Sequence, residues 1–269
     1  MRQQPCLARL LGSAAVLAVI SVGLGGCQTA GMPDITGSLG ARAEARASDN
    51  PKRAVDVYGE QYRANPKNID AAMKFGQALR ASGQRAQAVA VLEQANLTHP
   101  GNKPLLGLYG RALVDNGNFQ MAFDVLARAH SPQNPDWRIL SVQGTALDQL
   151  GRHDQARNYY ASALKIVPEE PSVLSNLGLS YVLSGDLPKA ETILRRAYAS
   201  PKADARVRQN LGLVVGLQGR FAEAEGIVKA DLPAEEAAAN VAYLKQMLDG
   251  RQKPRLGAHA EPAATRARS

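Results

Sequence analysis

Residues 171–204 read PSVLSNLGLSYVLSGDLPKAETILRRAYASPKAD, and this stretch decides the fold. Gly178, Gly185 and Ala190 occupy three positions in it that recur every 34 residues. The recurring residues are Gly76, Gly110, Gly144, Gly178 and Gly212, then Gly83, Gly117, Gly151, Gly185 and Gly219, then Ala88, Ala122, Ala156, Ala190 and Ala224. A constant period of this length predicts helix pairs that stack side by side into an all-α solenoid.

Each recurring small residue has a physical reason. The first glycine and the alanine lie where the two helices of a pair cross, and a minimal side chain there lets the helix axes approach to roughly 8–10 Å. The second glycine ends the first helix, because glycine adopts the left-handed conformation of a helix C-terminus without steric cost. Large apolar residues between these positions, such as Leu79 and Leu92, are expected to fill the core.

The first helices are also expected to begin at one phase of the period. A short polar residue precedes four of them, where its side chain can accept hydrogen bonds from free backbone N–H groups. These residues are Asn68, Asn102, Asp136 and Asp204. Glu170 takes the same place once and is followed by Pro171, a favoured first helical residue.

The period and its small residues resemble the tetratricopeptide repeat, and the resemblance implies a superhelical solenoid. The chain holds five repeats, at 69–102, 103–136, 137–170, 171–204 and 205–233. Residues 51–66 keep the register as the second helix of a degenerate repeat, whose first helix is expected near 39–47. Ala237, Val241, Leu244 and Leu248 form an apolar stripe that predicts a C-terminal capping helix.

The N-terminus has the features of a bacterial lipoprotein signal. Arg2 and Arg9 precede the apolar run at 10–24, which is shorter than the roughly 20 residues of a membrane-spanning helix. The sequence Leu24-Gly25-Gly26-Cys27 then resembles a lipobox, which implies cleavage before Cys27 and acylation of that residue. Gln28, in place of aspartate, favours the outer membrane of a Gram-negative cell by resemblance to sorted lipoproteins, with the mature chain facing the periplasm.

These signals divide the chain into four parts. We expect a signal peptide at 1–26, a linker with the degenerate helix at 27–50, the repeat domain at 51–249 and a tail at 250–269. The tail has five basic residues and one acidic residue, lacks apolar periodicity and is predicted to be disordered. Half of the chain's net charge of +8 therefore lies in the tail.

Composition and motifs argue against an enzyme. The four histidines are dispersed, and no HExxH, GxSxG or phosphate-loop motif occurs. Of the two cysteines, Cys6 leaves with the signal and Cys27 is expected to carry lipid, so no disulfide or thiolate metal site is predicted. We expect a non-enzymatic protein with no cofactor, no metal, no small-molecule substrate and no nucleic-acid partner.

The resemblance implies that the first helices line a concave face that binds peptides. Its candidate residues are basic in the N-terminal half (Lys74, Arg80, Arg111 and Arg138), and amide or apolar in the C-terminal half (Asn176, Leu179, Leu183, Asn210, Leu213 and Leu217). The asparagines are suited to hold a peptide backbone, the leucines its side chains and the basic end a carboxylate. In the alternative interpretation, the asparagines belong to the repeat's own pattern and some leucines face the neighbouring helix.

The C-terminal segment carries a narrower resemblance. Residues 206–248, which contain RVRQNLGLVVGLQGRFAEAE and DLPAEEAAANVAYLKQML, are similar to the TadD-like tetratricopeptide-repeat lipoproteins of the tight-adherence (Flp) pilus assembly system. The resemblance implies a pilotin-like scaffold that binds the secretin or another pilus component and has no catalytic residues. The alternatives are an adaptor lipoprotein that regulates cell-wall hydrolases or proteases, and an enzyme accessory or cryptic hydrolase.

Overall fold

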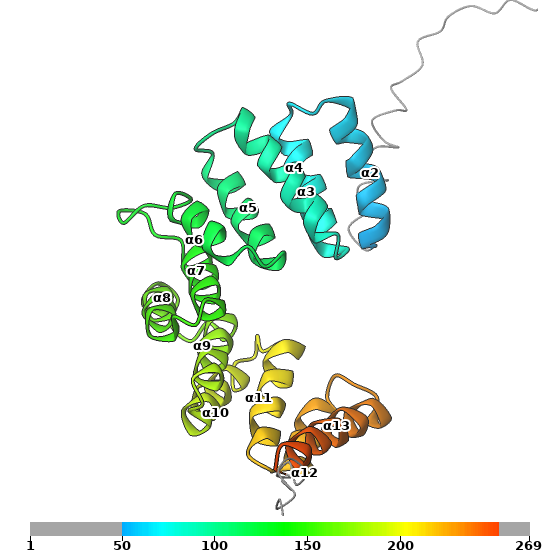
Figure 1. Ribbon diagram of the computed structural model, residues 1–269, viewed down its shortest axis with the longest axis vertical. Helices are drawn as coiled ribbons and strands as arrows, with labels where there is room; N and C mark the ends of the chain where they lie inside the picture. The colour runs from blue at the N-terminus through cyan, green and yellow to red at the C-terminus, as the bar shows by residue number, and fades with distance from the viewer. Residues whose placement is uncertain (1–49, 253–269) are drawn as a thin grey trace, which may run out of the picture. The chain divides into compact units, whose positions relative to one another are not determined.

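The computed structural model describes residues 50–252, with side chains for residues 50–249, and this part of the chain is built from helices (Figure 1). The helices are α2 (Pro51–Ala64), α3 (Ile69–Ala81), α4 (Arg85–Thr98), α5 (Lys103–Asp115), α6 (Phe119–Ala127), α7 (Trp137–Gln149), α8 (His153–Ile166), α9 (Pro171–Leu183), α10 (Leu187–Tyr198), α11 (Ala205–Leu217), α12 (Phe221–Val228) and α13 (Ala234–Gln252). Each of the five predicted repeats therefore contains one helix pair, from α3–α4 to α11–α12.

Contacts between helices follow the order of the chain. Each helix from α2 to α12 packs against the helix that follows it, and α13 packs on α11 as well as α12. The backbone of the first helix of every repeat also comes close to that of the first helix of the next repeat, whereas successive second helices in this part of the chain meet through long side chains, such as the rings of Phe123 and Tyr159 and the ion pair of Arg195 with Glu223. The first helices are therefore closer together than the second helices, and they line the inner side of the curve.

The first recurring glycine lies at the crossing of the two helices, as predicted. A Cβ atom built on Gly144 would lie 2.6 Å from Cε1 of Tyr160, which is far inside van der Waals contact. The same conflict occurs between Gly76 and Leu92, Gly110 and Leu126, Gly178 and Leu194, and Gly212 and Val228. The recurring alanine packs at the same crossing, and all five alanines are buried. Only small residues at these positions let the large residue of the second helix enter the core.

The second recurring glycine ends the first helix in all five repeats. Its φ angle lies between 74° and 85°, in the left-handed region. The next residue donates its backbone N–H to a carbonyl five residues back, as in the bond of 2.9 Å from Gln84 to Leu79. This geometry reverses the chain within two residues and positions the second helix against the first.

Four of the five predicted helix starts have a side-chain cap. Asn68, Asn102, Asp136 and Asp204 each accept a hydrogen bond from a backbone N–H in the first turn. Glu170 makes no such bond; its carboxylate instead accepts from the hydroxyl of Ser172 at 2.8 Å. The longer glutamate side chain reaches a hydroxyl of the first turn and no backbone N–H, so the prediction of a cap fails at this position.

The two ends of the described part differ. At the N-terminal end, α2 packs on α3 as the second helix of an incomplete pair, while its expected first helix at 39–47, the signal peptide and Cys27 lie outside the described residues. At the C-terminal end, α13 extends to Gln252, past the predicted boundary at residue 249, and buries Ala237 fully. Within residues 50–252, no helix combines the length and apolar character needed to cross a bilayer.

Candidate functional site

Three arginines from three successive repeats meet on the inner face. Arg80 of α3, Arg111 of α5 and Arg138 of α7 line one open cavity of about 510 Å³, here called the arginine cavity. Burial lowers the pKa of the Arg111 guanidinium, and the nearby charges of Arg80 and Arg138 lower it further, against the opposing effect of Asp136 and Asp115. The stacking of the first helices thus brings together three arginines that are separated by 31 and 27 residues in the sequence.

Lys74, the fourth predicted basic residue, is directed elsewhere. Its ammonium group lies 5.7 Å from the centre of the Tyr58 ring on α2. It does not line the arginine cavity. The predicted basic half of the groove is therefore a cluster of three arginines, with Lys74 beside the N-terminal helix.

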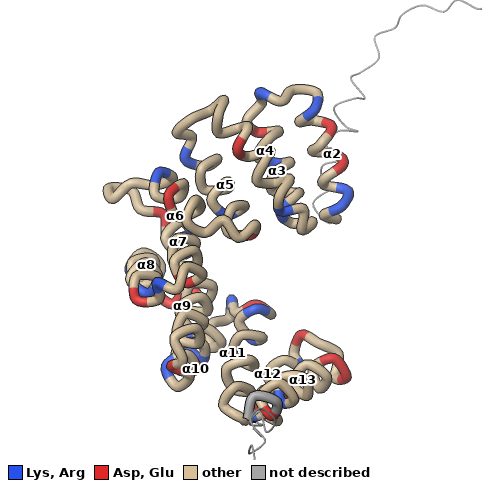
Figure 2. Tube along the Cα trace, viewed as in Figure 1, with Lys and Arg blue, Asp and Glu red and all other residues tan. Residues whose placement is uncertain are grey.

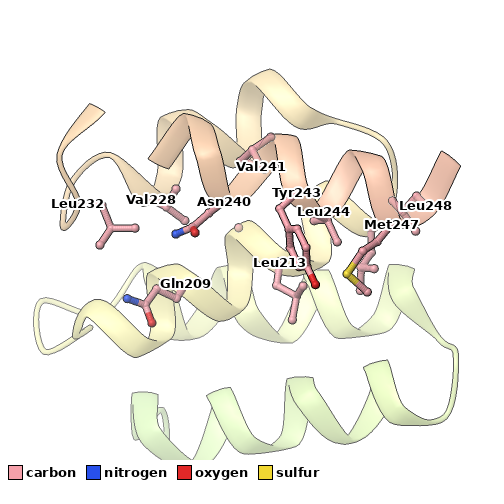
Figure 3. Close-up of a pocket in the computed structure, with 13 residues that line it drawn as sticks. Gln209, Leu213, Val228, Leu232, Asn240, Val241, Tyr243, Leu244, Met247 and Leu248 are labelled. Atoms are coloured by element: carbon pink, nitrogen blue, oxygen red, sulfur yellow. The ribbon is translucent and has the colours of Figure 1, made fainter. Parts of the chain in front are cut away.

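The C-terminal half of the inner face is apolar. A cavity of about 530 Å³ lies among α11, α12 and α13, and the side chains that line it include no charged residue. A smaller cavity of about 220 Å³ lies among α7, α8, α9 and α11, and Leu213 lines both cavities. Figure 3 shows Tyr243 and Met247 of α13 extending toward Leu213.

We call this region the apolar inner surface. It consists of Leu179, Val182, Leu183, Leu213, Leu217, Tyr243 and Met247. Several of its large side chains remain open to solvent: Leu183 is 52% exposed and Tyr243 is 66% exposed. In Figure 2, α9 is drawn in tan along its whole length because it has no charged residue, whereas basic positions appear on α3 and α5. The inner face therefore changes from basic to apolar along the chain.

The two predicted asparagines bridge neighbouring first helices. The Nδ2 atom of Asn176 donates to the hydroxyl of Ser141 at 3.0 Å, and Nδ2 of Asn210 donates to the hydroxyl of Ser175 at 2.8 Å. One donor of each amide is thus used within the array, which agrees with the alternative interpretation that these residues belong to the repeat's own pattern. The bond also holds each amide in one orientation on the inner face.

A buried carboxylate lies beneath the apolar inner surface. Asp148 of α7 accepts hydrogen bonds from the hydroxyl of Tyr160 on α8 at 2.9 Å and from the hydroxyl of Ser180 on α9 at 2.8 Å, and its Oδ1 lies 2.9 Å from Nδ1 of His153. Burial raises the pKa of the Tyr160 hydroxyl well above its usual range, and Asp148 raises it further. This network ties three helices from two repeats together.

Comparisons with known proteins agree on the fold. Two stretches, 45–112 and 141–205, match family models described as tetratricopeptide repeat. A tetratricopeptide-repeat protein from Parabacteroides merdae has a similar crystal structure, with a TM-score of 0.65 and 15% identity over 79% of this chain and 81% of that chain. The fold is a tetratricopeptide-repeat solenoid.

Other solved structures are similar over much of their length. PilW, described as a widely conserved type IV pilus biogenesis factor, has a TM-score of 0.62 and 18% identity over 78% of this chain and 97% of its own. A thermophilic protein from Thermus thermophilus has a TM-score of 0.56 and 22% identity over 68% of this chain and 98% of its own. A search of curated protein sequences finds no match. At these identities the similarity shows the fold alone.

The tetratricopeptide-repeat fold explains which residues sequence reasoning found and which it missed. Of the residues chosen from their repeat positions, Arg80, Arg111, Arg138 and the candidate leucines line cavities. Asp148, Tyr243, Met247 and Lys103, which also line these cavities, were not predicted. A period of 34 alone does not reveal that neighbouring first helices pair at an offset of 35, as in the bonds Arg80–Asp115, Ser141–Asn176 and Ser175–Asn210.

Proposed function

We propose that this protein is a lipid-anchored scaffold of the bacterial outer membrane that binds a protein partner through its inner face. Solenoids of this fold are in general non-catalytic and use their concave surfaces for protein partners. The apolar inner surface is the observation that carries the proposal, because exposed apolar side chains that adjoin one another mark interaction sites. Leu183, Leu213, Tyr243 and Met247 are all large and exposed, and each lines at least one of the two cavities that share Leu213.

The partner we propose is a component of a tight-adherence pilus, with the secretin as the first candidate. The similarity of residues 206–248 to TadD-like lipoproteins supports this assignment. PilW, which has the same fold over most of its length, is described as a pilus biogenesis factor, and this agrees with a role in pilus assembly. The lipobox at Cys27 supports a location at the outer membrane, where a secretin is assembled.

Recovery of partners from membranes tests the inner face. Leu213→Asp places a charge at the centre of the apolar inner surface, and we expect it to abolish partner recovery in a pull-down read by mass spectrometry. Leu97→Asp is the matched control, because Leu97 is 70% exposed but lies on α4, a second helix, outside these cavities. Equal recovery by Leu213→Asp and the wild type would refute binding at this surface. Recovery of wall hydrolases in place of pilus components would support the adaptor alternative.

Fractionation tests the lipid anchor separately. A Cys27→Ser variant lacks the acylated thiol, and several acyl chains at about 0.8 kcal/mol per buried CH₂ make release of the native form negligible. We expect the variant to leave the outer-membrane fraction and to lose acyl labelling. Normal fractionation of Cys27→Ser would show that the anchor assignment is wrong, without affecting the role of the inner face.

A further inference from the structure

The arginine cavity holds more positive charge than the chain neutralises. Four basic side chains line it, from Arg80, Lys103, Arg111 and Arg138, together with the single carboxylate of Asp136. Arg80 forms an ion pair with Asp115 at 2.7 Å. Within residues 50–252, Arg111, Arg138 and Lys103 have no carboxylate at ion-pair distance. The basic side chains that line the cavity therefore outnumber the carboxylates beside them.

We expect this arrangement to lower the stability of the free array. Arg111 is half-buried, and its burial together with the nearby Arg80 and Arg138 disfavours its charged form; Asp136 and Asp115 oppose this, but on balance the pKa of the guanidinium is lowered. Packing does not require the charge, since an apolar side chain of similar length would fill the same space without the repulsion. Residues that reduce stability in this way are typical of binding sites, where a ligand supplies the missing opposite charge.

We propose that the arginine cavity binds the carboxylates of an acidic segment of a protein partner. The inference rests on the proposed function, that the inner face binds a partner, and names the chemistry of one part of that partner. Guanidinium groups are planar and hold carboxylates with two parallel hydrogen bonds, so several arginines around one cavity select carboxylates at defined positions.

The walls of the cavity favour a peptide over a nucleic acid. Met73, Leu108 and Ile139 line it beside the arginines, and these apolar groups suit the methylene and aliphatic parts of a peptide. A nucleic acid needs a basic surface that extends along its backbone. The basic cluster here ends at α7, because α9 has no charged residue.

The chain's own flanking segments have little net negative charge to offer the arginines. Residues 250–269 contain five basic residues and one acidic residue, so the arginines repel them. In residues 28–49, the acidic residues Asp34, Glu44 and Asp49 are accompanied by Arg42 and Arg46, which leaves little net negative charge. The occupant is therefore a segment of another protein.

The test measures binding and stability together on the full-length protein in detergent. The probe is a short glutamate-rich synthetic peptide, and its glutamine counterpart is the control. We expect Arg111→Met to weaken binding of the glutamate peptide by about tenfold or more, as loss of a charge-assisted hydrogen bond predicts. Without peptide, Arg111→Met should melt at a higher temperature than the wild type. Addition of the peptide should raise the melting temperature of the wild type but not that of Arg111→Met.

Three further variants serve as comparisons and controls. Arg138→Gln, which keeps polarity, should also bind the peptide weakly, whereas Arg128→Met, at the exposed residue that follows α6, should bind normally. Replacement of Asp34, Glu44 and Asp49 by their amides should leave the melting temperature unchanged; a fall would identify the linker as the occupant and overturn the proposal. Equal binding by Arg111→Met and the wild type, or equal weakening by Arg128→Met, would also overturn it. Partner recovery in the Leu213→Asp experiment is independent of these results, so the two proposals can fail separately.

Discussion

Gly144 shows how one missing side chain determines the packing of a repeat. The Tyr160 ring occupies the space where a Cβ of residue 144 would lie, and its hydroxyl reaches Asp148. An alanine at residue 144 would have to displace a buried ring whose hydroxyl is bonded to Asp148. The glycine that recurs at this position is thus explained by the lack of space for one Cβ atom.

The first prediction compares two helical glycines. Gly144→Ala should lower the free energy of unfolding by roughly 1–3 kcal/mol through overpacking. Gly226→Ala should raise it by up to about 1 kcal/mol, because alanine favours the helix and a Cβ at residue 226 meets no atom within 4 Å. Urea denaturation followed by circular dichroism measures both. Equal effects of the two substitutions would show that the crossing is not tightly packed.

The second prediction concerns Tyr160 and alkaline pH. Burial and Asp148 raise the pKa of this hydroxyl in the folded state above the value near 10 of an unfolded chain. The tyrosine is neutral in both states below that value, and above it only the unfolded state ionises readily, so stability should be lost as the pH rises beyond about 10. Tyr160→Phe should reduce this loss, whereas Tyr243→Phe, at an exposed tyrosine, should not. Melting curves between neutral pH and pH about 11 test this; identical pH profiles for wild type and Tyr160→Phe would contradict it.

At the scale of the element, α13 completes the apolar inner surface. Its Leu244 lies over Gly216 of α11, where a Cβ would be 2.6 Å from Cδ2 of the leucine. The same helix presents Tyr243 and Met247 beside Leu213 (Figure 3). The seating of α13 on α11 therefore sets the shape of the larger cavity.

The third prediction is a double-mutant cycle on this contact. Gly216→Ala and Leu244→Ala should each destabilise the protein, the first by overpacking and the second by leaving a gap. In the double variant the new methyl group occupies space that the leucine has left. We therefore expect the double variant to be destabilised by about 0.5–2 kcal/mol less than the sum of the two single effects. Thermal unfolding of the four proteins measures the coupling. Strictly additive effects would mean that α13 does not rest on Gly216.

At the scale of the whole described solenoid, helices contact only near neighbours in the stack. Such arrays have a stability that is approximately a sum of repeat and interface contributions. Neighbouring repeats on both sides bury α5 and α7 extensively, whereas Ala237 is the one buried residue among the described side chains of α13. Stability is therefore expected to decrease toward the C-terminal end.

The fourth prediction follows from this gradient. Hydrogen exchange measured by mass spectrometry should be fastest in α13 and slowest in α5 and α7, because exposed helices open without disturbing the centre. A complex with the partner should slow exchange in α11 and α13 if the apolar inner surface is the binding site. Uniform protection of all helices in the free protein would contradict nearest-neighbour stability.

Much of this architecture can be predicted from the sequence, because each repeat folds through contacts between residues that are close together in the chain. Helix limits follow from residues such as Gly83 and Asn68, whose conformations and caps depend on a few neighbouring residues. Glu170 is the exception among the expected caps, because whether a longer side chain folds back is decided by competing partners such as Ser172. The candidate site was predictable only as a set of repeat positions.

The sequence by itself determined the helix pairs and their register, since these depend on contacts within one 34-residue unit. Tertiary structure alone decided that Arg80, Arg111 and Arg138 share one cavity while Lys74 lies by Tyr58, and that Leu213 joins two apolar cavities. It also decided that Asn176 and Asn210 bond to serines of the preceding repeat. The physical reason is that these contacts depend on how far each repeat is rotated and shifted against the next, and many side chains at the interface set that rotation together.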